Sequence, residues 1–88
     1  MKVVVMYRTN SEHGRKVEEF IHEFKRRYPQ DRVDSVAIDS REGMAMASLY
    51  DITSYPGIAV LREDGTPSMM WQGDTLPLID EVASYALH

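Results

Sequence analysis

The sequence predicts an α/β fold: a four-stranded mixed sheet with helices on both faces, in the order strand, helix, strand, helix, strand, strand, helix. The first supporting observation is a run of valines near the N-terminus, which predicts a strand buried on both faces. The second is the apolar stripe at helical spacing that follows it. The third is a turn signal at residues 63–65 between two β-prone runs, which predicts a hairpin. An 88-residue chain has room for one such domain, covering residues 1–88.

Residues 2–7 form the first predicted strand, which we place centrally in the sheet because it is almost entirely apolar. Residues 8–11 are polar turn formers, and Asn10 or Ser11 suits the position that caps a helix start, so a helix is expected to begin there. Pro29 ends this helix, because the residue before a proline avoids the helical region. The apolar stripe of the helix consists of Val17, Phe20, Ile21, Phe24 and Tyr28.

Residues 33–39 form the second predicted strand, parallel to the first across the intervening helix. Small residues between positions 41 and 51 predict a short second helix that approaches the sheet closely. Residues 57–61 and 68–72 form the hairpin, which Gly73 ends. Asp74 or Thr75 is expected to cap the last helix, with Pro77 in its first turn. The buried stripe of that helix consists of Ile79, Val82, Ala83 and Ala86.

Charge and hydropathy argue against several functions. A net charge of −4 argues against a nucleic-acid-binding protein, which needs a basic face to neutralise phosphates. The basic group Lys25, Arg26, Arg27 and Arg32 either complements the dipole of the first helix or forms a small local patch. The apolar run at residues 3–6 is shorter than a signal-peptide core or a membrane span. We therefore expect a cytoplasmic protein that does not bind membranes.

The chain contains no cysteine, which removes disulfides and every thiol-based activity. His13, His22 and His88 lack the i, i+4 spacing of helical metal ligands, so we expect neither a metal nor a cofactor. His13 also has no serine or carboxylate partner at a recognisable spacing. We therefore predict no catalytic residue and expect His13 on the surface of the first helix.

Residues 51–65, with the sequence DITSYPGIAVLREDG, resemble a stretch of the thioredoxins. In that family a helix end leads through Ile-x-x-x-Pro into a hydrophobic strand and a charged hairpin turn with glycine. Asp39, Gly73 and the amphipathic last helix are also similar to their thioredoxin counterparts. The resemblance implies a thioredoxin-like fold without the extra first strand and helix of larger thioredoxins, an extension that glutaredoxins also lack.

The same resemblance implies a cis peptide bond between Tyr55 and Pro56, next to the place of the family's redox site. It also places Ser11, Glu12, His13 and Gly14 where the family has Cys-x-x-Cys, to within about one residue. Both cysteine positions are therefore lost. A serine hydroxyl cannot replace the thiolate that a helix N-terminus stabilises, because thiol exchange requires sulfur.

The candidate binding groove therefore comprises Ser11, Glu12, His13, Gly14, Tyr55 and Pro56, and the expected function is redox-inactive binding of a protein or peptide. Ser11 either caps the helix only or also contacts a ligand. Tyr55 either faces the groove or packs on the first helix, and Tyr7 is expected near the same rim, where the two rings could present an aromatic groove.

Two other functions stay open. One is a thioredoxin- or glutaredoxin-like oxidoreductase whose site cysteine has been replaced in this sequence or is supplied by a partner. The other is a structural or dimerising role through the edge strand that carries Trp71. Met44, Met46, Met69 and Met70 form either an adaptable binding face or part of the core and edge.

Overall fold

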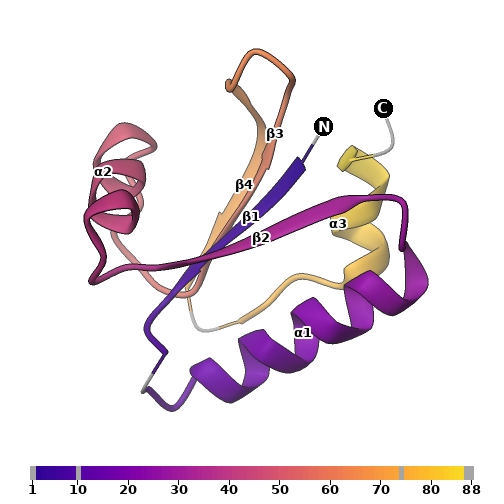
Figure 1. Ribbon diagram of the computed structural model, residues 1–88, viewed down its shortest axis with the longest axis horizontal. Coiled ribbons are helices and arrows are strands. Elements are labelled where there is room, and N and C mark those ends of the chain that lie inside the picture. The colour runs from indigo at the N-terminus through magenta and orange to yellow at the C-terminus, as the bar shows by residue number, and fades with distance from the viewer. Residues whose placement is uncertain (1, 10, 74, 87–88) are drawn as a thin grey trace.

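The computed structural model describes residues 2–9, 11–73 and 75–86, and Figure 1 shows its four-stranded sheet flanked by three helices. The element order is the one that the sequence predicts. The elements are β1 (Lys2–Tyr7), α1 (Gly14–Arg27), β2 (Arg32–Ala37), α2 (Arg41–Leu49), β3 (Gly57–Leu61), β4 (Pro67–Gln72) and α3 (Ile79–Ala86).

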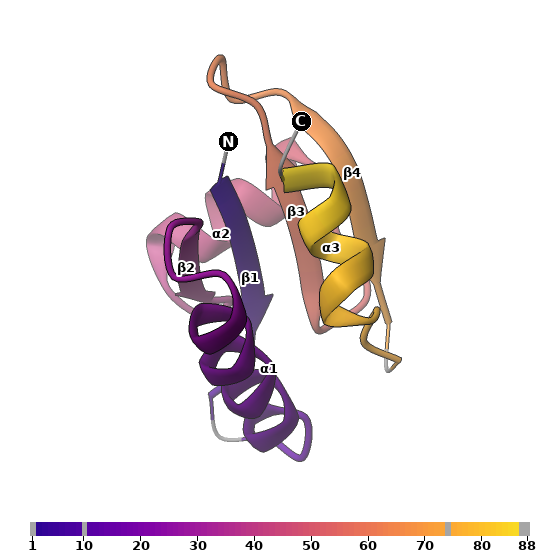
Figure 2. The ribbon, with the colours of Figure 1, turned by 90° about the vertical axis from the view of Figure 1, so that its right-hand side faces the viewer.

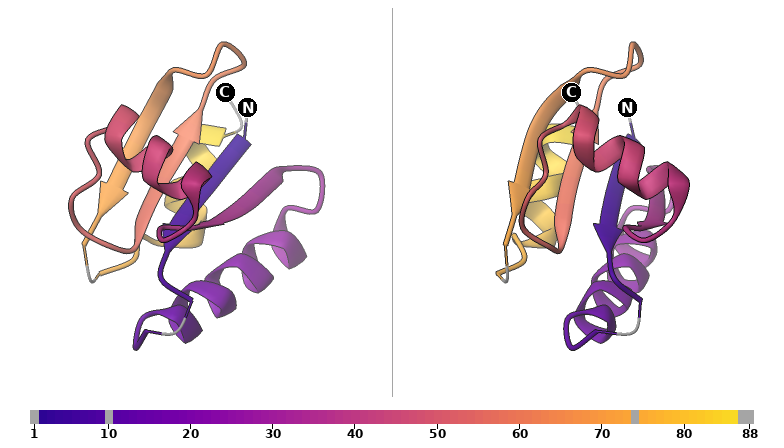
Figure 3. Two further views of the ribbon diagram at one scale, coloured as in Figure 1. Left: turned by 60° about the vertical axis from the view of Figure 1, so that its left-hand side comes forward. Right: turned by 90° about the vertical axis from the view of Figure 1, so that its left-hand side faces the viewer.

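The strands lie in the order β2-β1-β3-β4, so β1 has a neighbour on each side. It pairs in parallel with β2 and antiparallel with β3, and β3 and β4 form the predicted antiparallel hairpin. Figure 2 shows α1 and α3 on one face of the sheet, and Figure 3 shows α2 on the other. The mixed sheet with helices on both faces is therefore confirmed.

Two hydrophobic clusters follow from the alternation of side chains along β1. Val3 and Val5 point into the cluster beneath α1 and α3, whereas Val4 and Met6 point into the cluster beneath α2. A valine-rich strand buried on both faces is the expected occupant of this central position. The buried Phe24 ring of α1 lies 6.2 Å from the Phe20 ring and 5.4 Å from the Tyr28 ring, measured between centroids. These rings belong to or pack against the cluster that contains Val3 and Val5, so the predicted stripe packs on the sheet.

The expected starts of the first and last helices are wrong. Helix α1 begins at Gly14, because the Ser11 hydroxyl donates to the Arg8 carbonyl oxygen at 2.6 Å and a turn precedes the helix. Helix α3 begins at Ile79, two residues after Pro77, because the segment from Thr75 crosses from the end of β4 towards the core. The capping roles considered for Asn10 and Asp74 lie outside the described residues.

The end of the second strand also differs from the expectation. Strand β2 ends at Ala37, and Asp39 lies in the turn that leads to α2. The amide of Ser40 donates to the Ala37 carbonyl at 3.1 Å and closes this turn. The Ser40 side chain then caps α2 by accepting from the Gly43 amide at 2.9 Å.

Candidate functional site

Two loops meet at one end of the sheet. In the antiparallel pair of β1 and β3, Met6 lies opposite Gly57. The chain that leaves β1 at Arg8 and the chain that enters β3 through Pro56 therefore lie at the same sheet end, the lower one in Figure 1. This register brings the two halves of the predicted groove, residues 11–14 and 55–56, to a common end of the molecule.

The loop between β1 and α1 is held by its own polar groups. The Arg8 amide donates to Nε2 of His13 at 3.2 Å, and the Ser11 hydroxyl donates to the Arg8 carbonyl. The Gly14 amide donates to the Ser11 carbonyl at 3.1 Å. The expected role of Ser11 as a helix cap is therefore wrong. Its side chain instead stabilises the turn that precedes the helix. Glu12 is exposed, and His13 is half-buried in the loop rather than on the helix surface.

Gly14 is buried where the loop crosses the start of α1. A Cβ atom built on Gly14 would lie 2.7 Å from the Thr9 carbonyl oxygen and 3.3 Å from the Arg8 carbonyl oxygen. Both neighbours are backbone atoms, which cannot rotate away. Any side chain at position 14, including that of cysteine, therefore requires the loop to shift.

The loop before β3 contains the Tyr55–Pro56 peptide bond, which is cis, and Pro56 is buried. The Gln72 side chain at the end of β4 holds this loop, because its Oε1 accepts from the amides of Thr53 at 2.9 Å and Ser54 at 3.1 Å. The Gly73 amide donates to the Pro56 carbonyl at 3.2 Å. Sequence reasoning missed this role of Gln72, since a polar residue at a strand end carries no signal of such a distant contact.

The main chain of Tyr55 has polar groups without a hydrogen-bond partner among the described residues. Within the described part of the chain, no hydrogen bond uses the Tyr55 amide or carbonyl. Its side chain is half-buried, and its hydroxyl approaches the Ile52 carbonyl at 3.4 Å. The residue thus leaves one unpaired backbone donor and one unpaired acceptor beside Pro56.

The expected aromatic groove is not formed. Tyr7 is buried in the cluster beneath α1 and α3, whereas Tyr55 packs against the cluster beneath α2. The two rings therefore lie on opposite faces of the sheet. The alternative in which Tyr55 packs on the first helix is wrong, because Tyr55 packs beneath α2, on the face of the sheet opposite α1.

The methionines divide between core and surface. Met46 and Met70 pack against the cluster beneath α2, and Met69 is half-buried on the opposite face of β4. Met44 is 59% exposed. They therefore do not gather into one binding face.

Trp71 is half-buried on the α3 side of β4, where its ring meets Tyr85 edge-on at 5.6 Å between centroids. Trp71 and Met70 point to opposite faces, as the sequence predicts.

Carboxylates pair with much of the basic group near the end of α1. Glu23 binds both Arg26 and Arg27, and Arg27 also lies 3.5 Å from Asp80. Hydrogen bonds from Arg26 are the main cause of the lowered pKa of Glu23. Arg32 pairs with Asp34 at 3.2 Å on β2. These contacts favour the interpretation of the group as local ion pairing over that of a patch for phosphates.

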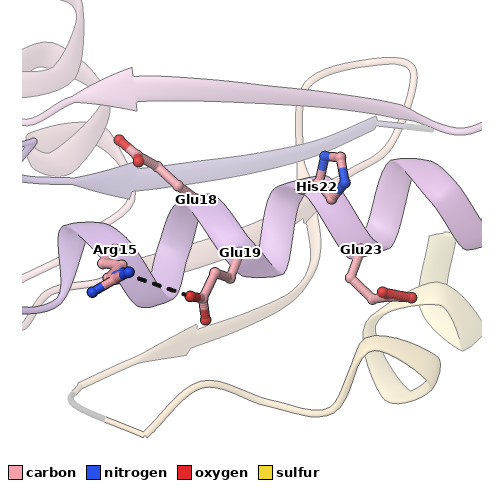
Figure 4. Close-up of a pocket in the computed structure, with 5 residues that line it drawn as sticks. All are labelled: Arg15, Glu18, Glu19, His22 and Glu23. Atoms are coloured by element: carbon pink, nitrogen blue, oxygen red, sulfur yellow. Dashed lines mark ion pairs between the residues drawn. The ribbon is translucent and has the colours of Figure 1, made fainter.

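The outer face of α1 carries a shallow hollow of about 480 Å³, drawn in Figure 4. Its residues all come from this helix, and Arg15 pairs with Glu19 at 3.8 Å. Within residues 2–9, 11–73 and 75–86, no three His, Asp or Glu side chains converge as metal ligands do. Over the same residues, no helix has the length and apolar character needed to cross a membrane.

The fold is thioredoxin-like, and the chain that adopts it contains no cysteine. Thioredoxin O2 from Arabidopsis thaliana superposes with a TM-score of 0.71 and 16% identity, covering 94% of this chain and 69% of that one. Oxidised thioredoxin from Plasmodium falciparum gives a TM-score of 0.69 and 18% identity over 97% of this chain and 82% of that one. Thioredoxin 1 from Thermosipho africanus gives a TM-score of 0.69 and 10% identity, covering 97% of this chain and 89% of that one.

No protein-family model matches the sequence, and no curated protein sequence is similar to it. At these levels of identity the structural neighbours establish the fold alone. The role of the sheet end at residues 11–14 and 55–56 must therefore be argued from the residues of this chain.

Proposed function

We propose that this protein is a redox-inactive thioredoxin-like domain that binds an extended peptide segment of a partner at the sheet end formed by residues 11–14 and 55–56. The observation that carries the proposal is the unpaired amide and carbonyl of Tyr55 next to the buried Pro56. An extended peptide can satisfy both groups by main-chain hydrogen bonding, which gives affinity without demanding a particular sequence.

The surrounding residues support a preformed site. Gln72 accepts hydrogen bonds from the Thr53 and Ser54 amides, and hydrogen bonds join Arg8 to Ser11 and His13 in the other loop. A site that is already ordered loses little conformational entropy when a ligand binds. The peptide itself then bears most of the ordering cost.

The charge around the start of α1 suggests the chemistry of the peptide. Arg8 and Lys16 are exposed there and the first turn of α1 carries no acidic residue, whereas Arg15 pairs with Glu19 and the exposed Glu12 lies in the preceding loop. The first amides of a helix and its dipole also favour negative charge. We therefore expect the preferred peptides to carry an acidic side chain or a free carboxylate close to the backbone that pairs with Tyr55.

The absence of cysteine supports the redox-inactive part of the proposal, and the lack of room at Gly14 strengthens it. The test is catalysed insulin reduction in the presence of dithiothreitol, together with glutathione-disulfide exchange. Both rates should equal those of buffer, with Ser11→Cys as a comparison that restores one sulfur. Activity of the unsubstituted chain in proportion to its concentration would show that it is an oxidoreductase.

Peptide binding is tested by selecting short extended peptides from a random display library and titrating them into labelled protein. Amide shifts should cluster at residues 11–14 and 55–57. A peptide methylated on the backbone nitrogen that faces Tyr55 should bind at least about tenfold more weakly, since a buried bond of this kind contributes about 1 kcal/mol and methylation adds a clash.

The matched control is the same peptide methylated one residue away, where the nitrogen points to solvent. Equal affinity of the two methylated peptides would rule out main-chain pairing. Shifts confined to β4 would move the binding site to the sheet edge. The expected cytoplasmic location stays a prediction, which fractionation of cells that express the chain would test.

A further inference from the structure

Strand β4 forms an open edge of the sheet. Among the described strands it pairs with β3 alone, and no other element lies beyond it in the two side views (Figures 2 and 3). An edge strand presents a row of unpaired amides and carbonyls to any extended chain that can align with it. The edge is separate from the sheet end that holds Pro56 and Tyr55.

The two edges of the sheet differ in their protection. Strand β2 carries Arg32 and Asp34, which pair with each other, and Lys2 of β1 also approaches Asp34 at 3.9 Å. Strand β4, with the sequence PSMMWQ, carries no charged residue. Proteins keep edge strands from pairing with charged side chains, prolines or bulges, and β4 has only Pro67 and the neighbouring bulge, both at its first end.

The register of the hairpin decides which groups of β4 are free. The Gly73 amide bonds to the Pro56 carbonyl, so hydrogen-bonded pairs with β3 recur at Trp71 and Met69. The amides and carbonyls of Met70 and Gln72 therefore point away from the sheet. A bulge between Val60 and Leu61 shifts the register, so the alternation of paired and free residues along β4 does not continue from Met69 to Pro67.

Only one antiparallel register of two copies pairs all of these free groups. It sets Met70 of each copy opposite Gln72 of the other and places Trp71 on the two-fold axis. The two Trp71 residues then form a non-hydrogen-bonded pair, the position at which facing side chains come closest. Each Met69 lies opposite a glycine, Gly73, which leaves room beside the indoles.

The side chains beside the edge suit this contact. Trp71 is half-buried and already meets Tyr85, which is 38% exposed, so the axis would gather four aromatic rings. On the other face, Met70 lines a hollow of about 440 Å³ together with Leu49, which is 72% exposed, and with the carboxylates of Asp51 and Asp64. Apolar side chains therefore flank the free edge on both faces of the sheet, beside two carboxylates on the α2 face.

We propose that β4 pairs antiparallel with β4 of a second copy of this chain, with Trp71 at the two-fold axis, to form a continuous sheet across a symmetric dimer. A second copy is a suitable partner for two reasons. Two β4 strands bring no like charges together, and the free backbone groups of Met70 in one copy pair with those of Gln72 in the other. Since each copy carries a net charge of −4, salt should strengthen the dimer by screening long-range repulsion.

The first test measures mass by light scattering across a concentration series up to millimolar, together with exchange of backbone amides. The mass should rise from 10.1 kDa towards twice that value. The Met70 and Gln72 amides should gain protection as the dimer forms, whereas those of Met69 and Trp71 are protected at every concentration. The emission of the single tryptophan should shift to the blue over the same range.

The second test compares two lysine variants with the wild-type protein. Met69→Lys places a charge beside the axis in both copies and should raise the dimer dissociation constant at least about tenfold, whereas Ser35→Lys places the same charge on the exposed edge of β2 and should leave it unchanged. Circular dichroism verifies that both variants fold. A mass of 10.1 kDa at every concentration overturns the proposal, as does protection of Met69 and Trp71 alone, or an equal effect of the two lysines.

Discussion

Gly14→Ala tests the close contact at the start of α1. The added Cβ would stand 2.7 Å from the Thr9 carbonyl oxygen and 3.3 Å from that of Arg8. Because both neighbours are backbone, the loop of residues 8–13 has to move. Overpacking of this kind costs about 1–3 kcal/mol, and the better helix propensity of alanine returns at most about 1 kcal/mol. We expect a net destabilisation of about 1–2 kcal/mol.

The assay is urea denaturation followed by circular dichroism, together with thermal unfolding. A loss of 1 kcal/mol lowers the melting temperature of a domain of this size by about 4–8 °C. Lys16→Ala is the matched control, because Lys16 is exposed in the same turn and its replacement should change the stability by less than about 0.5 kcal/mol. If Gly14→Ala unfolds at the same urea concentration as the wild-type protein, the loop does not constrain position 14 and the reasoning fails.

Three further predictions concern packing and hydrogen bonds away from position 14. Gln72→Ala should speed exchange of the Thr53 and Ser54 amides and lower stability by about 1 kcal/mol, whereas unchanged exchange would show that Gln72 does not hold the loop. Phe24→Ala removes a fully buried ring and should cost about 3–5 kcal/mol in urea denaturation. The Tyr28 hydroxyl donates to Asp80 at 2.7 Å, and this bond is the main cause of the raised pKa of Tyr28. The folded protein therefore holds the phenol proton more tightly than the unfolded chain, so the stability advantage of wild type over Tyr28→Phe should persist below pH 10.0 and fall as the pH rises above it. A constant difference across that range would contradict this assignment.

The folded protein shows how positions 11 and 14 are built without cysteine. The resemblance places the two cysteines of the thioredoxins at Ser11 and Gly14. The loop at these positions differs from a site in which only the sulfur atoms have been replaced. The Ser11 hydroxyl shapes the turn, and the carbonyl groups of Thr9 and Arg8 occupy the space that a side chain at position 14 would need. We therefore expect Ser11→Cys to fold normally and a cysteine at position 14 to disturb the loop. Cysteines introduced at both positions 11 and 14 should not form a dithiol with working geometry.

Local patterns in the sequence determined most of the secondary structure. The valine run of β1 and the stripe of α1 each bury their apolar residues in only one way, and the exposed Glu-Asp-Gly turn at residues 63–65 separates two β-prone runs, so these elements follow from short stretches of sequence. The same holds for the order of the elements and for the pairing of β3 with β4. The exact start of a helix does not follow from such patterns. Whether Ser11 and Pro77 belong to a helix or to the segment before it depends on the path of the chain between the sheet and that helix.

Tertiary structure decided the contacts between residues distant in sequence. The bond from Gln72 to the loop before Pro56 and the separation of Tyr7 from Tyr55 both depend on how strands are placed side by side. The sequence identified residues 11–14 and 55–56 as neighbours by resemblance, but the parity of each strand settled which face a side chain occupies. The alternation along a strand is local, but which set of side chains faces α1 and α3 and which faces α2 depends on how the strands are paired and covered.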